Sequence, residues 1–250
     1  MTPTDDTLAR KALAIHDRLA RAYGAPFAYF QSLDPLSELV STLLNHRTRN
    51  RTAKAAFERL RARYPDWADV RDAPVAEIEA AIAGVTWPEA KAPRLQEVLR
   101  AVERRAGRLD LGFLADLPVA EARAWLEAIP GVGPKSSAAV LSFSTLRRPA
   151  LPVDSHHHRV AQRVGLIGKT VAVGPSHAVL QGYLPEGWDA QQVYDHHQLF
   201  MRHGQKVCHW RSPDCEGCVL FDLCDAVQAR TVPVPAPELP LWAAGRGAPP

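Results

Sequence analysis

Apolar residues recur at helical spacing along almost the whole chain, and the alternation typical of strands is nearly absent. Residues 6–23, for example, place Leu8, Ala12, Ile15 and Leu19 on one face. The same spacing predicts further short helices, separated by Pro- and Gly-containing breaks. These are expected at 35–46, 50–63, 74–83, 89–105, 119–128, 135–145, 155–165, 174–183 and 189–202. The chain is therefore expected to fold as an all-α protein.

Length and composition limit the class of protein. A chain of 250 residues can bury one large core or two moderate ones. Its 46% hydrophobic and 23% charged residues are ordinary for a soluble globular protein. No apolar run is long enough to span a membrane, and the N-terminal residues lack the apolar core of a signal peptide. We expect a cytoplasmic chain with no membrane partner; the net charge of +3 says little about a nucleic-acid partner.

A glycine-rich turn stands between two predicted helices at residues 126–140, which read LEAIPGVGPKSSAAV. Gly131 and Gly133 allow backbone angles that a Cβ disfavours, and they let a partner approach the backbone closely. Pro134 suits the first turn of the second helix. The N–H groups of Gly131, Val132 and Gly133, with the following helix N-terminus, would suit a phosphate and so grip DNA without reading its sequence. Taken alone, PGVG fits a plain tight turn between helices equally well.

All four cysteines fall in one short segment, as Cys208, Cys215, Cys218 and Cys224. Such clustering in a chain without a secretory signal indicates a metal site rather than disulfides. Four thiolates in one loop can hold a [4Fe–4S] cluster, whereas structural zinc more often uses two separated cysteine pairs. The spacing alone is compatible both with an iron–sulfur cluster and with zinc.

A second motif, LPVDSHHHRVAQRVG at 151–165, follows the glycine-rich turn. Together with the turn, its lysine and the cysteine spacing, it resembles the endonuclease III family of helix–hairpin–helix DNA glycosylases. The resemblance covers about residues 30–226 and includes the family pattern V-D-[TS]-H-x-x-R-V. The matching positions are Val153, Asp154, Ser155, His156, Arg159 and Val160, with His196, His197, His203 and Gly204 as further landmarks.

The resemblance implies that Lys135 is the nucleophile and Asp154 the essential carboxylate. The chemistry suits both residue types, because a carboxylate stabilises positive character at the sugar C1′ and a neutral amine can form a Schiff base there. A free lysine has a pKa of about 10.4, so burial or a helix N-terminus must lower the pKa of Lys135. Without the family context, Lys135 would be interpreted as a solvated lysine and Asp154 as a helix N-cap.

The resemblance also assigns a cofactor and contacts. It implies that the four cysteines bind a [4Fe–4S] cluster, and that Arg211, in the loop between the first two, contacts the DNA backbone. His156 is expected at the DNA as well. The three consecutive histidines 156–158 are not expected to form a metal site, because neighbouring helical residues point in different directions.

Two segments depart from the family pattern. Where relatives carry a gap-filling glutamine, this chain has His46 and Arg47. Arg47 is expected to fill the gap left by a flipped base and Arg49 to meet a phosphate; the alternative is a solvated basic helix end. In GVTWPEAKAPR (84–94), either Val85 or Trp87 is expected to wedge into the duplex, Trp87 in the core being the alternative. Lys91 matches a family lysine that is expected at the DNA.

These patterns predict two helical lobes with DNA between them. A six-helix barrel with the helix–hairpin–helix is expected at 28–146, an iron–sulfur lobe at 1–27 plus 147–227, and a Pro-rich tail at 228–250. The expected protein is a monomer, associated with the bacterial nucleoid, that binds double-stranded DNA containing damaged bases or abasic sites. It would excise oxidised pyrimidines and cleave 3′ to abasic sites. The alternatives are a non-catalytic damaged-DNA-binding protein and a monofunctional mismatch glycosylase, whose adenine type needs an acid where this chain has Ser41.

Overall fold

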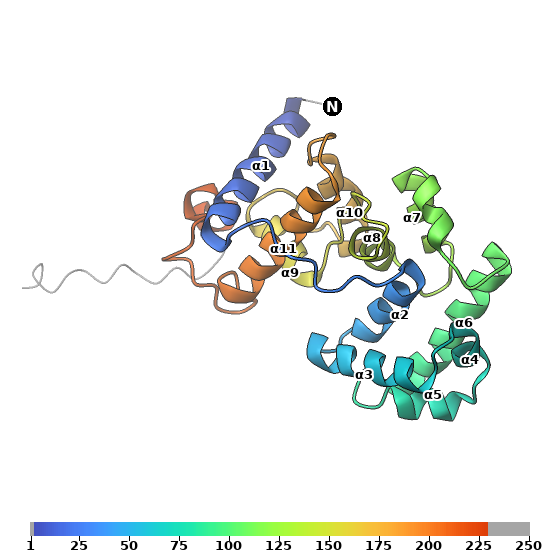
Figure 1. The fold of residues 1–250 in the computed structure, drawn as a ribbon. Helices are drawn as coiled ribbons and strands as arrows, with labels where there is room; N and C mark the ends of the chain where they lie inside the picture. Colours follow the sequence, from blue (N-terminus) through green and yellow to red (C-terminus); the bar gives the residue numbers. More distant parts are fainter. Residues whose placement is uncertain (1–2, 230–250) are drawn as a thin grey trace, which may run out of the picture.

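The computed structural model describes residues 3–229 and, over that range, contains helices and no strand. Twelve α-helices and two short 3-10 helices follow one another (Figure 1). Their bounds are α1 (Pro3–Tyr23), α2 (Pro35–Asn45), α3 (Asn50–Arg63), α4 (Trp67–Asp72), α5 (Val75–Ala81), α6 (Pro88–Ala106), η1 (Gly112–Asp116), α7 (Val119–Glu127), α8 (Pro134–Phe143), α9 (Ser155–Arg163), α10 (Val173–Gly182), α11 (Ala190–Lys206), η2 (Phe221–Leu223) and α12 (Asp225–Gln228). The predicted all-α class is confirmed.

Local signals explain where the helices that carry the site begin. Asp34 caps α2 by accepting the N–H groups of Leu36 and Ser37 at 3.0 and 2.9 Å. Asp189 forms a capping box with Gln192 at the start of α11. The predicted helices other than α1 start within one residue of their predicted positions, and α1 starts three residues earlier than predicted. The six-residue α4 was too short for a period to reveal it.

Buried apolar side chains form two large clusters. The first extends from Leu36 on α2 to Ala150 and is built from α2 to α8. The second joins α1 to the chain from Leu151 to Leu220. Figure 1 shows the corresponding two lobes, with α1 packed along α11 although the two lie at opposite ends of the described chain. Helix α8 contacts α2 and α7 in the first lobe and α10 and α11 in the second, so it lies where the lobes meet. Lys135 in its first turn is within electrostatic reach of a residue of each lobe, Glu38 and Asp154.

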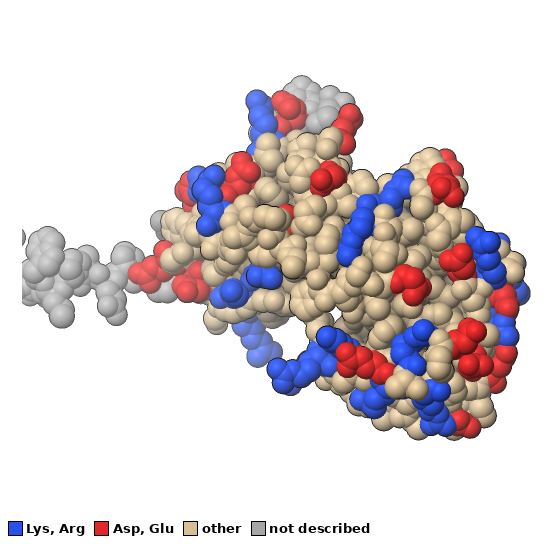
Figure 2. All heavy atoms as spheres, viewed as in Figure 1, with Lys and Arg blue, Asp and Glu red and all other residues tan. Residues whose placement is uncertain are grey.

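The surface between the lobes is hollowed. Figure 2 shows a notch between them, with Lys and Arg side chains on both of its sides. No helix among residues 3–229 has the length and apolarity needed to cross a membrane. Most of the predicted Pro-rich tail lies outside the described residues; its first residue, Gln228, ends α12.

Candidate functional site

The glycine-rich turn connects α7 to α8 as a tight hairpin. Gly131 adopts a φ of 93°, in the left-handed region that favours glycine. Gly133 has a φ of −101°, which any residue adopts, so the expectation of a special conformation at both glycines was wrong for Gly133. A Cβ at Gly133 would meet nothing within 4 Å, and this open space leaves room for the close approach of a partner. Val132 is buried in the first core, and its N–H donates to the carbonyl oxygen of Ile129 at 3.0 Å. The expectation that this N–H would meet a phosphate was therefore wrong.

The hairpin presents unused donors. Within residues 3–229, no acceptor bonds the backbone N–H of Gly131 or Gly133. Pro134, which has no N–H, begins α8 directly after them. The N-terminus of a helix with unpaired N–H groups attracts anions. This part of the fold therefore has the features of a phosphate site.

Lys135 lies in the first turn of α8, where the two lobes meet. Burial lowers the pKa of Lys135, while the nearby charges of Asp154 and Glu38 oppose that change. No hydrogen bond or ion pair to its ammonium occurs among the described residues. A desolvated lysine without a bonded partner loses its proton more easily than a solvated one, and the neutral amine is a nucleophile.

Asp154 is the N-cap of α9, and its Oδ1 accepts the N–H of His157 at 2.7 Å. The backbone just before it is fixed by two buried histidines. His177 Nε2 accepts the N–H of Val153 at 3.0 Å, and His197 Nδ1 lies 2.8 Å from the carbonyl oxygen of Pro152. His177 stands in no motif, so this contact could not be predicted from the sequence. These contacts hold Asp154 within electrostatic reach of Lys135.

Two side chains of the α2 segment complete the surroundings of Lys135. His46 Nε2 lies 3.1 Å from Ser136 Oγ, next to the lysine. Desolvation of the ring side that faces α8, with the charges of Lys135 and Lys91, lowers the pKa of His46, although the residue as a whole is exposed. Glu38 is 4% exposed, and burial raises its pKa to about 7. Glu38 was not predicted as a site residue, because one glutamate in an otherwise uncharged helix belongs to no motif.

Arg47 and Trp87 form an exposed pair on the rim of the site. Both have left-handed backbones, with φ of 52° and 57°, and the guanidinium lies 5.7 Å from the indole centroid. Thr86 Oγ1 donates to the carbonyl oxygen of Arg47 at 2.9 Å and ties the two loops together. Trp87 is 52% exposed, which excludes the alternative that it packs in the core. Backbone strain at two adjacent exposed side chains is typical of functional positions.

Two other rim expectations need correction. Val85 is 4% exposed and belongs to the first core, so it does not present a wedge. Lys91 Nζ donates to the carbonyl oxygens of Leu44 and His46, both at 2.7 Å, and to Thr48 Oγ1 at 2.9 Å. Its ammonium thus caps the C-terminus of α2 rather than reaching toward a DNA phosphate. Arg49, the residue before α3, remains exposed.

The histidines 156–158 point in different directions, as expected. His156 lies against Gly204, and its Nδ1 is 3.2 Å from Arg159 Nη2. His157 is buried among aromatic rings, and neither ring nitrogen has a hydrogen-bond partner in the described part of the chain. His158 Nε2 lies 2.8 Å from the carbonyl oxygen of Val171. His156 and His157 both lie against α11, but only His156 is part-exposed and so could reach a DNA partner.

The four cysteines follow α11, and two of them contact Arg163 at the end of α9. Arg163 Nη1 lies 3.2 Å from Cys208 Sγ, and the carbonyl oxygen of Arg163 lies 3.4 Å from Cys224 Sγ. Each thiol lies within electrostatic reach of others in the set. Among the described residues, no three His, Cys, Asp or Glu side chains converge as they would on a single metal ion. The loop between the first two cysteines presents Trp210, 74% exposed, and the exposed Arg211.

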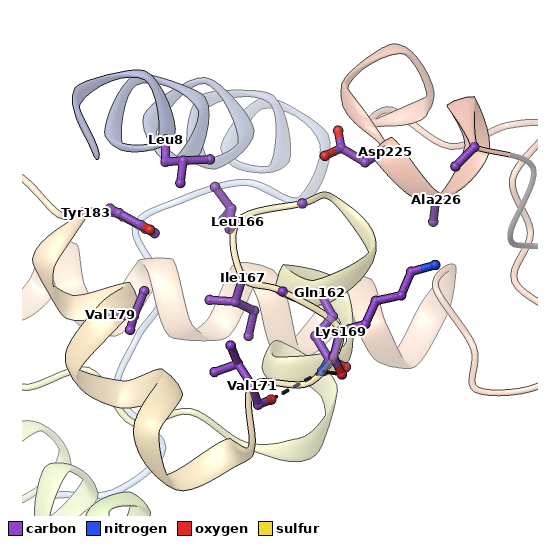
Figure 3. Close-up of a pocket in the computed structure, with 13 residues that line it drawn as sticks. Leu8, Gln162, Leu166, Ile167, Lys169, Val171, Val179, Tyr183, Asp225 and Ala226 are labelled. Atoms are coloured by element: carbon purple, nitrogen blue, oxygen red, sulfur yellow. Dashed lines mark hydrogen bonds between the residues drawn. The ribbon is translucent and has the colours of Figure 1, made fainter. Parts of the chain in front are cut away.

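A pocket of about 500 Å³ lies elsewhere, in the second lobe (Figure 3). Its walls are mostly apolar and come from α1, α10 and the segment after α9. They include Leu8, Leu166, Ile167, Val171 and Val179. Neither Lys135 nor Asp154 lines it, so this pocket is separate from the site described above.

Comparison with known proteins gives the family. Residues 40–178 match the model of the HhH-GPD superfamily base excision DNA repair proteins. The chain belongs to this superfamily. Within it, endonuclease III of Sulfolobus acidocaldarius is 26% identical over 190 residues, which cover 74% of this chain and 79% of that protein. A DNA glycosylase homologue of Arabidopsis thaliana is 32% identical over 173 residues; the match covers 69% of this chain but only 57% of that protein.

Solved structures agree on the fold of this superfamily member. A trapped covalent intermediate of endonuclease III with DNA has a TM-score of 0.74 and 23% identity, covering 89% of this chain and 98% of that one. A thermostable thymine-DNA glycosylase has a TM-score of 0.71 and 22% identity, covering 88% and 98%. The chain therefore has an endonuclease III-like fold, as the sequence motifs predicted.

Proposed function

We propose that this protein is a bifunctional base-excision glycosylase that removes a damaged base from DNA and then cleaves the strand 3′ to the abasic site. The observation that carries the proposal is Lys135: a half-buried lysine without a bonded partner in the described chain, at the start of α8 and within electrostatic reach of Asp154. The names of similar proteins, endonuclease III above all, support the same class. Oxidised pyrimidines are the proposed substrates.

The geometry suggests how the steps divide among the residues. The hairpin N–H groups of Gly131 and Gly133 would hold a backbone phosphate, and Arg47 and Trp87 would occupy the duplex where a nucleotide has flipped out. As the base departs, Asp154 would stabilise the positive character at C1′. The neutral amine of Lys135 would then bond to C1′, and the resulting Schiff base would make the C2′ proton acidic enough for elimination of the 3′ phosphate.

The cysteine segment supports a proposed [4Fe–4S] cluster. Cys208, Cys215, Cys218 and Cys224 would hold it, and the cluster would supply structural order to the loop that carries Arg211. The fit rests on the donor set: four thiols within electrostatic reach of one another, with the N–H of Leu220 donating to Cys218 Sγ at 3.4 Å. Such N–H···S contacts are typical of cluster ligands. Purified protein should absorb at about 400 nm and contain iron and labile sulfide; stoichiometric zinc instead would overturn this assignment.

The function is tested by incubating the protein with duplexes that contain one oxidised pyrimidine or one abasic site. Wild type should release the base and nick the strand, and Lys135→Ala should lose nicking. Arg211→Ala, outside the reaction centre, should weaken DNA binding in a salt-dependent way but leave cleavage at saturation intact. Base release without nicking would favour a monofunctional glycosylase, and binding without either reaction would favour the damaged-DNA-binding alternative.

A further inference from the structure

Glu38 is a buried acid that the proposed steps do not use. It lies on α2 in the first lobe, and α2 packs against α8, whose first turn carries Lys135. Its Oε2 accepts Gln31 Nε2 at 3.0 Å, and the same amide nitrogen lies 3.2 Å from Ser41 Oγ. Its Oε1 has a long contact of 3.5 Å with Thr42 Oγ1. Since Oε1 is the more weakly bonded oxygen, it is the one better able to carry and transfer a proton.

Two cationic side chains, one on α8 and one just after it, lie near Glu38. Lys135 faces it from α8, and Arg147 faces it from the segment after α8; Gln31 and Thr42, its hydrogen-bond partners, are uncharged. Burial raises the pKa of Glu38 to about 7, and these cations and hydrogen bonds only partly oppose that rise. A carboxyl group with such a pKa is present near pH 7 both with and without its proton.

Two carboxyl groups in unlike environments therefore lie within electrostatic reach of Lys135. Asp154 is half-buried and bonded to a backbone N–H, whereas Glu38 is enclosed between helices. Enzymes that cleave glycosidic bonds use such a pair, because one carboxylate stabilises the developing cation and the other carboxyl group protonates the leaving group. A general acid works best when its pKa lies near the working pH.

We propose that protonated Glu38 is a general acid that donates its proton to the departing base. The O–H bond of Glu38 breaks, and the proton bonds to a ring nitrogen or carbonyl oxygen of the base. The electron pair of the C1′–N bond goes to the base, which leaves as a neutral molecule, and C1′ receives the amine of Lys135. Glu38 remains as a carboxylate and regains its proton from solvent. This inference rests on the proposed glycosylase function and extends it to bases that leave poorly as anions.

The test compares two single-turnover reactions of the full-length protein. One is excision from duplex DNA that carries a damaged base; the other is borohydride trapping on DNA with a preformed abasic site, where no base remains to be protonated. Glu38→Gln should slow excision by roughly 10²- to 10⁴-fold and change trapping little. The loss should be greatest for the poorest leaving base. Glu121→Gln, an exposed glutamate on α7, is the matched control and should change neither reaction.

The pH profile provides a second readout. The reactive form of Glu38 carries a proton, so wild-type excision should decline as the pH rises through about 7. Excision by Glu38→Gln should not depend on pH in this way. Glu38→Asp should excise more slowly than wild type but show the same decline, and it provides the test if Glu38→Gln folds poorly. Equal losses of excision and trapping in Glu38→Gln, or undiminished excision, would overturn the inference. Absence of trapping by wild type would instead overturn the proposed lyase function.

Discussion

Asp154 combines a structural and a chemical role that two substitutions should separate. Its Oδ1 accepts the N–H of His157 at 2.7 Å and so caps α9. Alanine removes this cap, which should cost about 1 kcal/mol and lower the melting temperature by about 2–4 °C in a chain of this size. Asparagine caps helices about as well as aspartate, so Asp154→Asn should melt close to the wild-type temperature.

The chemical role depends on the carboxylate charge, which both substitutions remove. The charge of Asp154 raises the pKa of Lys135, so Asp154→Asn should lower that pKa further and leave more neutral amine. If supply of the amine limited the reaction, this variant would react faster. We expect instead that base excision falls by roughly 10²-fold or more, because the charge that stabilises the C1′ cation is gone.

Thermal unfolding and single-turnover excision, measured on Asp154→Asn and Asp154→Ala, test both statements. Both variants should lose excision, and only the alanine variant should lose stability. If the asparagine variant is destabilised as much as the alanine variant, the capping argument is wrong. If it excises as fast as wild type, the electrostatic role of Asp154 is wrong.

Three further predictions follow from packing and hydrogen bonds. A Cβ at Gly204 would lie 2.8 Å from the Cβ of His156, so Gly204→Ala should destabilise the second lobe by about 1–3 kcal/mol; an unchanged melting temperature would contradict this close packing. Lys91→Met leaves the carbonyl oxygen of Leu44 without its donor and should lower the free energy of unfolding, measured by chemical denaturation, by about 1–3 kcal/mol. If this variant keeps its stability and loses only DNA affinity, Lys91 contacts a DNA phosphate after all. Trp87→Ala, at an exposed side chain, should leave stability within about 0.5 kcal/mol of wild type but slow excision from duplex DNA more than from single strands; equal effects on both would refute the wedge.

Periodicity and capping made the fold predictable. The helical spacing located most of the helices, and the PGVG sequence located the turn between α7 and α8. Helix α4 was missed because six residues are too few to display a period. The conformation of Gly133 could not be inferred, since glycine is compatible with almost any backbone angle and its neighbours decide which one is used.

The candidate site was predictable where chemistry follows a local motif. Lys135 and Asp154 each lie in such a motif, and the fold brings both to the junction of the lobes. Val85 and Lys91 were misassigned because the sequence of a loop does not show where its side chains point. Val85 turns into the core, and Lys91 bonds the C-terminal end of α2. Glu38 is the one charged residue of α2, but it belongs to no motif, and only the packing of α2 on α8 reveals that Lys135 faces it.

The central claim is that the amine of Lys135 bonds to C1′ of the damaged nucleotide. Borohydride reduction during reaction with abasic-site DNA, followed by digestion and mass spectrometry, tests it most directly. We predict a covalent protein–DNA adduct whose modified peptide carries the sugar on Lys135, and none with Lys135→Ala. An adduct on another lysine, or wild-type protein that nicks DNA without any adduct, would contradict this account.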